Sequence, residues 1–374
     1  MPDVQRAQVL AYRIAAHGLH RAGTDPAALA VLDLGVQDVG GRATASLAVA
    51  ARTGSAALSL EDDERFTLAW THRGAPHYHR ASEFPGLLPA LFPVDDADAL
   101  ARLGWRPAEA EAAGMPAREI LLTAARSLRK AVGHAMTKGA ASAAVTRLVP
   151  DALSRWCRGC QATHIHEQLM RLAAPLAGLA LVPGASPATL VPVPGRPRIP
   201  AEADVPGATG TVQCYLRLHG PATAGEAAGF VGSTRAIVAG QLWPGDLAEV
   251  RVEGRTAHLP ADRLAELEHP PEPDLVRLLP PGDPYLQARD RALLVPEKAR
   301  QQELWRVLGN PGALLADGEI AGTWRAKASG RRLEITVDPF RPLPRSVRAR
   351  VEAEAELVAA VRGQDKVAVR WPGS

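Results

Sequence analysis

"GPATAGEAAGFVGSTRAIVAGQLWPGDLAEVRVEGRTAHLP", residues 220–260, contains two helix starts and one hairpin in a short run. Thr223 is followed three residues later by a glutamate, which is the spacing of a capping box, and Ser233 is a second candidate N-cap. Alternating apolar and polar residues flank Glu253-Gly254, which predicts two strands joined by a tight turn. With a helix expected over 211–218, the order is helix, helix, helix, hairpin. This order is typical of a winged-helix module.

The same order of elements recurs twice upstream in the chain. The first group has expected helices over 4–21, 26–32 and 43–53, followed by a strand pair over 66–80. The second has expected helices over 116–132, 137–148 and 163–176, followed by apolar strands in "LALVPG" and "ATLVPVP". In the second group Thr137 and Thr163 are the candidate N-caps. Three similar modules therefore precede the C-terminal part of the chain.

The C-terminal part, residues 275–371, has a different pattern. Strand-like runs are separated by Asp-Gly and Ser-Gly turns, a helix is expected over 345–362, and "KVAVRW" reads as a last strand. We therefore expect an α+β protein with tandem winged-helix (helix-turn-helix) domains and a C-terminal β-barrel-like domain. The expected boundaries are 1–110, 111–205 and 206–272 for winged helices 1, 2 and 3, and 273–374 for the β-rich domain.

Composition restricts the class of protein and its location. The chain has 374 residues, of which 47% are hydrophobic, and a net charge of +3, so several folded cores are expected and the overall charge alone identifies no partner. We expect no membrane span, because no apolar run is long enough. The N-terminal stretch reads as an amphipathic helix, not a signal peptide. We expect a cytoplasmic protein whose three cysteines are reduced, without cofactor.

"RWCRGCQATHIHEQ", residues 155–168, combines residue types that bind metals. Cys157 and Cys160 have the C-x2-C spacing of zinc sites, and His164 and His166 follow closely. All four converge only if the chain turns near Gly159. The alternative is a reduced cysteine pair at the start of a helix capped by Thr163, with the histidines facing DNA or the core. A thioredoxin-like reading is weaker, since no βαβ pattern surrounds the cysteines.

Two hairpins carry the side chains expected to contact DNA. Arg73 and His77 lie in the first expected wing, and wings commonly donate to phosphate. In the C-terminal hairpin "GTWRAKASGRRLE", basic residues surround Trp324, which we expect to pack in the barrel. The full set of expected DNA-binding residues is Arg73, His77, Thr163, His164, His166, Ser233, Arg235, Arg325, Lys327, Arg331 and Arg332.

Several stretches together resemble one known family. "LGVQD", "WTHRGAPHYHR", "HIHEQLMRLA", "LRLHGPATAGEAAGFVGSTRA", "LLPPGDPYLQARDR" and "IAGTWR…RLEITVDPF" occur in the order found in the AlkZ-like (YcaQ-like) winged-helix DNA glycosylases. The resemblance covers nearly the whole chain. It implies tandem winged helices and a C-terminal β-barrel around a DNA channel, acting without a metal. Its characterised members remove bulky N-alkylpurines and unhook interstrand crosslinks.

The resemblance also implies a catalytic loop. Active members carry Gln-x-Gln or Gln-x-Asp after the second helix, and the matching residues here are Gly35, Val36 and Gln37. The second glutamine is kept and the first is a glycine, while Asp38 offers a carboxylate one residue later. Gln37 and Asp38 are therefore the expected catalytic residues; the alternative is that they cap the following helix. His77 matches a histidine of the family's hairpin motif.

Two function classes follow from these residues. The first is a DNA glycosylase of DNA repair that hydrolyses the N-glycosidic bond of alkylated purines, with bulky adducts or crosslinks as further substrates. The second is a DNA-binding protein without catalysis, a lesion sensor or regulator, which Gly35 favours. A zinc hydrolase lacks an H-E-x-x-H motif and is set aside. The partner is double-stranded, alkylated DNA, and a monomer is expected, since all modules lie in one chain.

Overall fold

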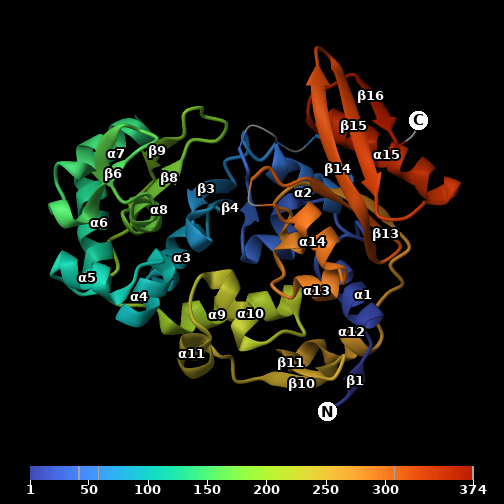
Figure 1. Cartoon of the computed structure of the whole chain (residues 1–374), viewed down its shortest axis with the longest axis horizontal. Coiled ribbons are helices and arrows are strands. Elements are labelled where there is room, and N and C mark those ends of the chain that lie inside the picture. Colours follow the sequence, from blue (N-terminus) through green and yellow to red (C-terminus); the bar gives the residue numbers. More distant parts are fainter. Residues whose placement is uncertain (41–42, 58, 307, 373–374) are drawn as a thin grey trace. The chain divides into compact units, whose positions relative to one another are not determined.

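The computed structural model describes residues 1–374 apart from 41–42, 58, 307 and 373–374. The chain forms two compact units, and Figure 1 labels most of their helices and strands. Unit 1 comprises Met1–Asp63, Gln213–Glu226 and Gly245–Ser374, and unit 2 comprises Glu64–Val212 and Ala227–Pro244. Each unit is described by itself below. The expected division into four domains stays a prediction.

Unit 1 combines short helices with two sheets. Its helices are α1 (Arg6–Ala16), α2 (Thr44–Thr53), α12 (Leu264–Glu268), α13 (Arg291–Leu294), α14 (Lys298–Leu304) and α15 (Arg345–Val361). Its strands are β1 (Asp3–Val4), β2 (Val36–Gln37), β10 (Leu247–Val252), β11 (Arg255–Pro260), β12 (Val276–Leu279), β13 (Gly312–Ala316), β14 (Glu319–Ser329), β15 (Arg332–Pro339) and β16 (Lys366–Arg370). Strands β1, β10 and β11 form one sheet, in which β10 and β11 are the expected hairpin.

The C-terminal strands form a curled, half-barrel sheet in the order β12-β13-β14-β15-β16 (Figure 1). Helix α15 covers it, burying Val347, Val351 and Val358 against the sheet's apolar face. Along β14, residues 320–324 are buried, Trp324 among them, and the strand becomes largely exposed from Arg325 on. The β-rich C-terminal part and the buried position of Trp324 are confirmed; the Trp324 indole donates to the Leu279 carbonyl at 2.8 Å.

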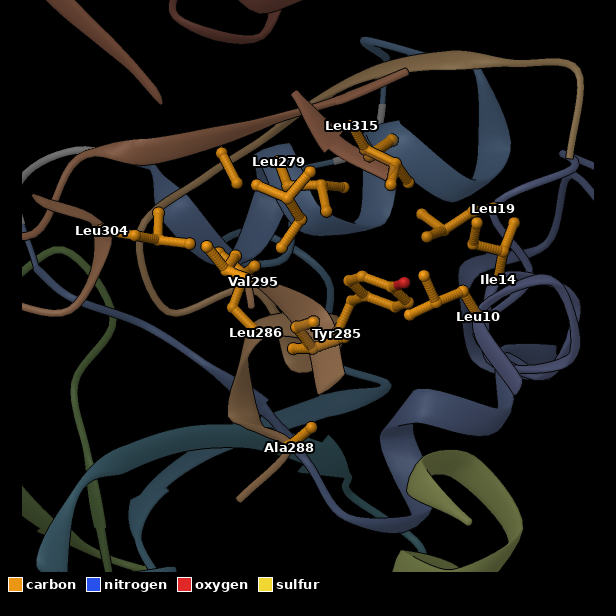
Figure 2. Close-up of a cluster of buried hydrophobic side chains, with 14 of the residues drawn as sticks. Leu10, Ile14, Leu19, Leu279, Tyr285, Leu286, Ala288, Val295, Leu304 and Leu315 are labelled. Carbon is orange, nitrogen blue, oxygen red and sulfur yellow. The ribbon is translucent and has the colours of Figure 1, made fainter. Parts of the chain in front are cut away.

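A second apolar core of unit 1 surrounds one tyrosine. Figure 2 shows the Tyr285 ring, from the short turn η7 (Pro284–Gln287), pointing toward Leu10, Ile14 and Leu19. Tyr285 is only 1% exposed, and burial raises the pKa of its hydroxyl. This packing fixes α1 against the segment that follows β12.

Two buried ion pairs hold the same segment. Arg52 of α2 forms two hydrogen bonds of 2.9 Å with the carboxylate of Asp283, and both side chains are 0% exposed. Arg13 of α1 forms a second fork with Asp290, at 3.0 and 2.7 Å. Paired guanidinium–carboxylate forks satisfy several donors and acceptors at once, which burial of charge requires. Residues 283–290 are thus clamped at both ends.

Unit 2 consists mainly of helices around one sheet. Its helices are α3 (Phe84–Leu91), α4 (Asp96–Leu103), α5 (Pro107–Ala113), α6 (Ala117–Ala131), α7 (Lys138–Thr146), α8 (Glu167–Leu176) and α11 (Arg235–Ile237). Its strands are β3 (Phe66–Trp70), β4 (Pro76–Arg80), β5 (Met136–Thr137), β6 (Ser154–Cys157), β7 (Ala162–Ile165), β8 (Leu179–Leu181) and β9 (Thr189–Pro192). The strands pair in the order β4-β3-β8-β9-β5, and β6 pairs only with β7 among these strands. Helices α9 (Val205–His219) and α10 (Ala224–Val231) each contribute to both units.

Local cap signals were good predictors of helix starts. The capping box before α10 is present, with the Thr223 amide donating to Glu226 at 2.7 Å and the return bond at 3.3 Å. Thr137 caps α7 through the Ala140 amide at 3.4 Å. The mixed α+β class is confirmed by these elements.

Three expected elements differ from the structure. Thr163 is not an N-cap: it lies on β7, and α8 begins only at Glu167. Ser233 is not the cap of α11 either, because Thr234 accepts the Ile237 amide there at 3.2 Å. The expected helix over 26–32 is a pair of 3-10 turns. For α11 an adjacent hydroxyl residue is the cap, whereas α8 has His166 at its N-cap position and no side-chain cap, because Thr163 pairs in a strand.

Loss of one partner of the buried fork between Arg52 and Asp283 should strongly destabilise unit 1. Asp283→Ala leaves an unpaired buried guanidinium and should lower the free energy of unfolding by about 3–5 kcal/mol. The matched control is Glu266→Ala, which removes an exposed partner of Arg263 at 2.6 Å. It should cost less than about 1 kcal/mol. Urea unfolding measures both variants, and equal losses would contradict the assignment.

Candidate active site

The loop after the turn η2 (Ala30–Asp33) carries the expected catalytic residues. Gly35 is buried and has φ of 82°, a left-handed conformation that glycine adopts without strain and glutamine does not. The Gly35 amide donates to the Leu32 carbonyl at 3.0 Å, which closes the turn. The backbone conformation at position 35 therefore suits glycine, which stands where the resemblance places the family's first glutamine.

Gln37 is half-buried and its side-chain carbonyl has a fixed partner. Gln287 Nε2 donates to Gln37 Oε1 at 2.9 Å and to the Gly282 carbonyl at 3.2 Å. Gly282 lies so close to the loop that a Cβ there would come within 2.9 Å of Val39 Cγ2. The backbone at Gly282 has φ of 79°, which also favours glycine. These contacts orient the Gln37 amide and leave its Oε1 a second lone pair.

Asp38 is held at the entrance to α2. Its Oδ1 accepts from Thr44 Oγ1 at 3.0 Å, and its Oδ2 accepts from the Gly40 amide at 3.3 Å. Thr44 Oγ1 in turn accepts from the Val39 amide at 2.8 Å. The carboxylate thus stabilises the loop before α2, but it does not cap the helix, because the N-cap residue is Ala43 and no side chain caps it there. Each carboxylate oxygen keeps further acceptor capacity.

The two Arg–Asp forks position this site. Gln287 lies between Asp283 and Asp290, the two residues held by the forks of α2 and α1. Helix α2 contacts both the loop, through Thr44, and the 283–290 segment, through Arg52. The Gln37–Gln287 hydrogen bond therefore joins two elements whose positions are already fixed.

A pocket of about 320 Å³ opens beside the same segment, at Pro281. Its lining residues include one aromatic side chain, Trp324, and two cationic ones, Arg325 and Arg362. This volume lies in the range of small-ligand pockets.

The expected DNA-binding residues of the β14–β15 hairpin are exposed. Arg325 and Lys327 alternate on the outward face of β14, and Arg331 and Arg332 lie at the turn. Arg325 donates to the Gly309 carbonyl at 2.9 Å, and Arg331 pairs with Asp365. The hairpin thus presents four guanidinium or ammonium groups to solvent.

In unit 2 the first expected wing is present as a hairpin, but its histidine lies elsewhere than predicted. The hairpin β3–β4 is present, but His77 is only 1% exposed, so it is not a surface phosphate ligand in this structure. His77 Nδ1 and His79 Nε2 each lie 3.0 Å from Thr71 Oγ1. The histidines pack inward because they belong to the same buried polar cluster.

The Arg73 side chain contacts other residues of the protein and does not extend into solvent as expected of a phosphate ligand. Its guanidinium stacks 5.0 Å from the centre of the Phe230 ring and donates to the Phe230 carbonyl. Ser233 also has an internal partner, since its Oγ donates to Asp98 at 2.6 Å. Arg235 is exposed at the start of α11. Of these three expected DNA contacts, Arg235 has the most accessible side chain.

The cysteine–histidine stretch forms a hairpin. Thr163 is exposed on β7 opposite Trp156, and His164 lies opposite Arg155. The thiols of Cys157 and Cys160 and one nitrogen of His164 lie within 4.8 Å of one another. His166 is outside this group and packs against Trp105, with ring centres 5.3 Å apart. The turn near Gly159 therefore brings three of the four expected ligands together.

Comparisons with known proteins agree with this architecture. The profile of the family described as DNA glycosylase AlkZ-like matches residues 31–361. The chain belongs to the AlkZ-like DNA glycosylase family. The expected resemblance is thereby confirmed, and membership of a family of DNA glycosylases implies that the chain binds DNA.

One solved structure extends the comparison to the fold. Streptomyces sahachiroi DNA glycosylase AlkZ superposes with a TM-score of 0.74 at 22% sequence identity, covering 99% of this chain and 100% of that one. The two proteins share a fold. No curated protein sequence matches the chain. Among the described residues, no helix is long and apolar enough to cross a membrane.

Sequence reasoning missed the residues that support the site. Gln287 and Gly282 lie 250 and about 245 positions from Gln37, and nothing local to either indicates the pairing. The only available signal was their presence in "LLPPGDPYLQARDR", one of the stretches that carry the resemblance.

Five buried histidines should make stability depend on pH. Burial lowers the pKa of His17 and His79 to about 3 and holds the pKa of His72, His77 and His219 well below its ordinary value. Below an unfolded pKa of about 6.5 the unfolded chain takes up protons that the native state does not. The free energy of unfolding should therefore be constant near pH 7.5 and fall as pH drops from about 6.5 towards 4.

Denaturant titrations from pH 7.5 to 4.5 measure this effect. Each histidine should contribute a slope of up to about 1.4 kcal/mol per pH unit. His79→Gln should reduce the pH dependence of the free energy of unfolding by the contribution of one histidine. The control His134→Gln, at an exposed position, should leave that pH dependence unchanged. A pH-independent stability across this range would contradict the neutral, buried assignment.

Proposed function

We propose that this protein is a DNA glycosylase that hydrolyses the N-glycosidic bond of alkylated purines in double-stranded DNA. The observation that carries the proposal is the hydrogen bond from Gln287 to Gln37, which orients a glutamine carbonyl in the loop where the family's catalytic motif falls. Family membership supplies the reaction class.

Hydrolysis of this glycosidic bond needs little acid catalysis from the enzyme. A purine alkylated at N7 or N3 is cationic, so its bond to the sugar is already weak and leaving-group protonation is not needed. What remains is a positioned water and negative charge or dipoles facing the developing oxocarbenium ion. The nucleotide must also leave the base stack to reach the site.

Gln37 and Asp38 fit these two tasks. The amide of Gln37 cannot take up a proton at neutral pH, but its carbonyl, held by Gln287, can orient the attacking water through its remaining lone pair. The Asp38 carboxylate is fixed by Thr44 and Gly40 and can stabilise the cation or accept the water's proton. Both roles need the fixed geometry that α2 and the 283–290 segment provide.

DNA contact is proposed mainly through exposed cations. Arg325, Lys327, Arg331 and Arg332 on the β14–β15 hairpin can donate to phosphates, and Arg235 can do so from α11. We further propose that the helical groups are winged-helix modules and that the chain acts as a monomer on one duplex.

A second candidate function is DNA binding without catalysis. Gly35 favours it, because the motif's first glutamine is absent and the left-handed backbone disfavours its return. A non-catalytic protein would bind DNA through the same cationic surface as a glycosylase. It would differ from a glycosylase only in not releasing the base.

Release of 7-methylguanine from a methylated duplex tests the proposal. The parent protein should release the base, and Gln37→Ala or Asp38→Asn should each reduce the rate about 100-fold or more, because water placement or charge stabilisation is lost. Matched controls are Gln302→Ala and Asp62→Asn, at exposed positions, which should keep the parent rate.

The outcomes separate the two functions. Retained duplex binding without release from methylated, bulky-adduct or crosslinked DNA would contradict the glycosylase and favour the non-catalytic protein. Equal rates in parent and variants would show that Gln37 and Asp38 are not the catalytic residues.

Duplex binding tests the hairpin separately. Arg325→Ala and Lys327→Ala should each weaken binding to any sequence and reduce the slope of log affinity against log salt by about 1. The control Arg106→Ala removes a cation whose side chain is 84% exposed in unit 2. It should leave the slope unchanged, and an unchanged slope in the hairpin variants would contradict phosphate contact.

A further inference from the structure

The hairpin β6–β7 brings together three metal-binding side chains that the proposed reaction does not use. Cys157 is the last residue of β6, Cys160 lies in the four-residue connection, and His164 is on β7. Gln161 closes the connection with φ of 50°. A C-x2-C turn followed by a ligand on the returning strand is the arrangement of zinc-binding hairpins.

The ligand atoms are close to coordination distance. The two sulfurs and one imidazole nitrogen all lie within 4.8 Å of one another. Around a tetrahedral zinc ion with bonds of about 2.0–2.3 Å, ligand atoms are about 3.3–3.8 Å apart. Side-chain rotations of the exposed hairpin can close the difference of about 1 Å without moving the core.

The surroundings favour the forms of these groups that bind metal. The ring of His164 is a hydrogen-bond partner of the Cys157 sulfur, so these two candidate ligands already face each other. His164 Nδ1 lies 2.7 Å from the Ile165 carbonyl, so Nδ1–H donates there. The lone pair of Nε2 then remains for a metal, which is the usual arrangement of a ligating histidine.

The nearest other candidate ligands are engaged elsewhere. Glu167 accepts from Lys138 and Arg171, each at 2.7 Å, and these cations neutralise its charge. His166 packs on Trp105 outside the group. Cys160 is exposed, so the fourth position of a tetrahedral site faces solvent and would be taken by water.

We propose that Cys157, Cys160 and His164 bind one zinc ion that cross-links the β6–β7 hairpin. The hairpin pairs with no other strand among those described, and most of its residues are solvent-exposed, so a metal cross-link would supply order that packing does not. The site shares no residue with the Gln37–Asp38 loop, and the proposal does not depend on the proposed glycosylase activity.

Metal content of the full-length protein tests the proposal. Protein without a histidine tag is prepared under reductant, loaded with zinc, freed of excess by gel filtration and assayed by elemental analysis together with a thiol titration. The parent should retain about one equivalent of zinc, and Cys157→Ser, Cys160→Ser and His164→Ala should each retain less than about a tenth. The matched control is Cys214→Ser, which replaces the third cysteine, in α9, and should bind zinc like the parent.

Cobalt supplies a second readout. Co²⁺ in the parent should show the visible bands of tetrahedral coordination and a thiolate charge-transfer band, both lost in Cys157→Ser. Circular dichroism checks that the variants remain folded; a variant that unfolds is replaced by Cys157→Ala. Reduced parent without zinc, zinc retained in all variants, or a Cys157–Cys160 disulfide that persists under reductant would each overturn the proposal.

Discussion

The buried Arg52–Asp283 and Arg13–Asp290 forks are the constraint on which the candidate site depends. Each places a buried guanidinium from an N-terminal helix against a buried carboxylate more than 200 residues later. Separating such a pair leaves an unpaired buried charge, which is strongly destabilising. The segment between the two aspartates therefore has one strongly favoured position. The Tyr285 core packs the same segment from its apolar side.

That fixed segment explains the form of the site. Gln287 reaches Gln37 from a clamped turn, and Gly282 allows the loop to approach where any Cβ would collide with Val39. Asp38 is held by the start of α2, the helix that also carries Arg52. A site built on two helices and a clamped turn can keep a carbonyl and a carboxylate oriented with little reorganisation, which is what water placement and charge stabilisation require.

Local signals predicted much of the fold and little of the site. The capping box at Thr223, the Thr137 cap and the hairpin around Glu253-Gly254 come from short-range patterns with direct physical causes, and the structure has them. The prediction failed where neighbours in space decided the outcome. His77 is buried in hydrogen-bonding distance of Thr71, and Thr163 lies on β7, opposite Trp156 of β6. Gln287 was missed because no sequence pattern links it to a residue 250 positions away.

A double-mutant cycle on base release tests the central claim most directly. Rates of 7-methylguanine release are measured for the parent, Gln37→Ala, Gln287→Ala and the double variant. If Gln287 acts by orienting Gln37, its loss should lower the rate in the parent and have little further effect in Gln37→Ala, a coupling of at least about 1 kcal/mol. Additive losses, or a Gln287→Ala rate equal to that of the parent, would contradict the account.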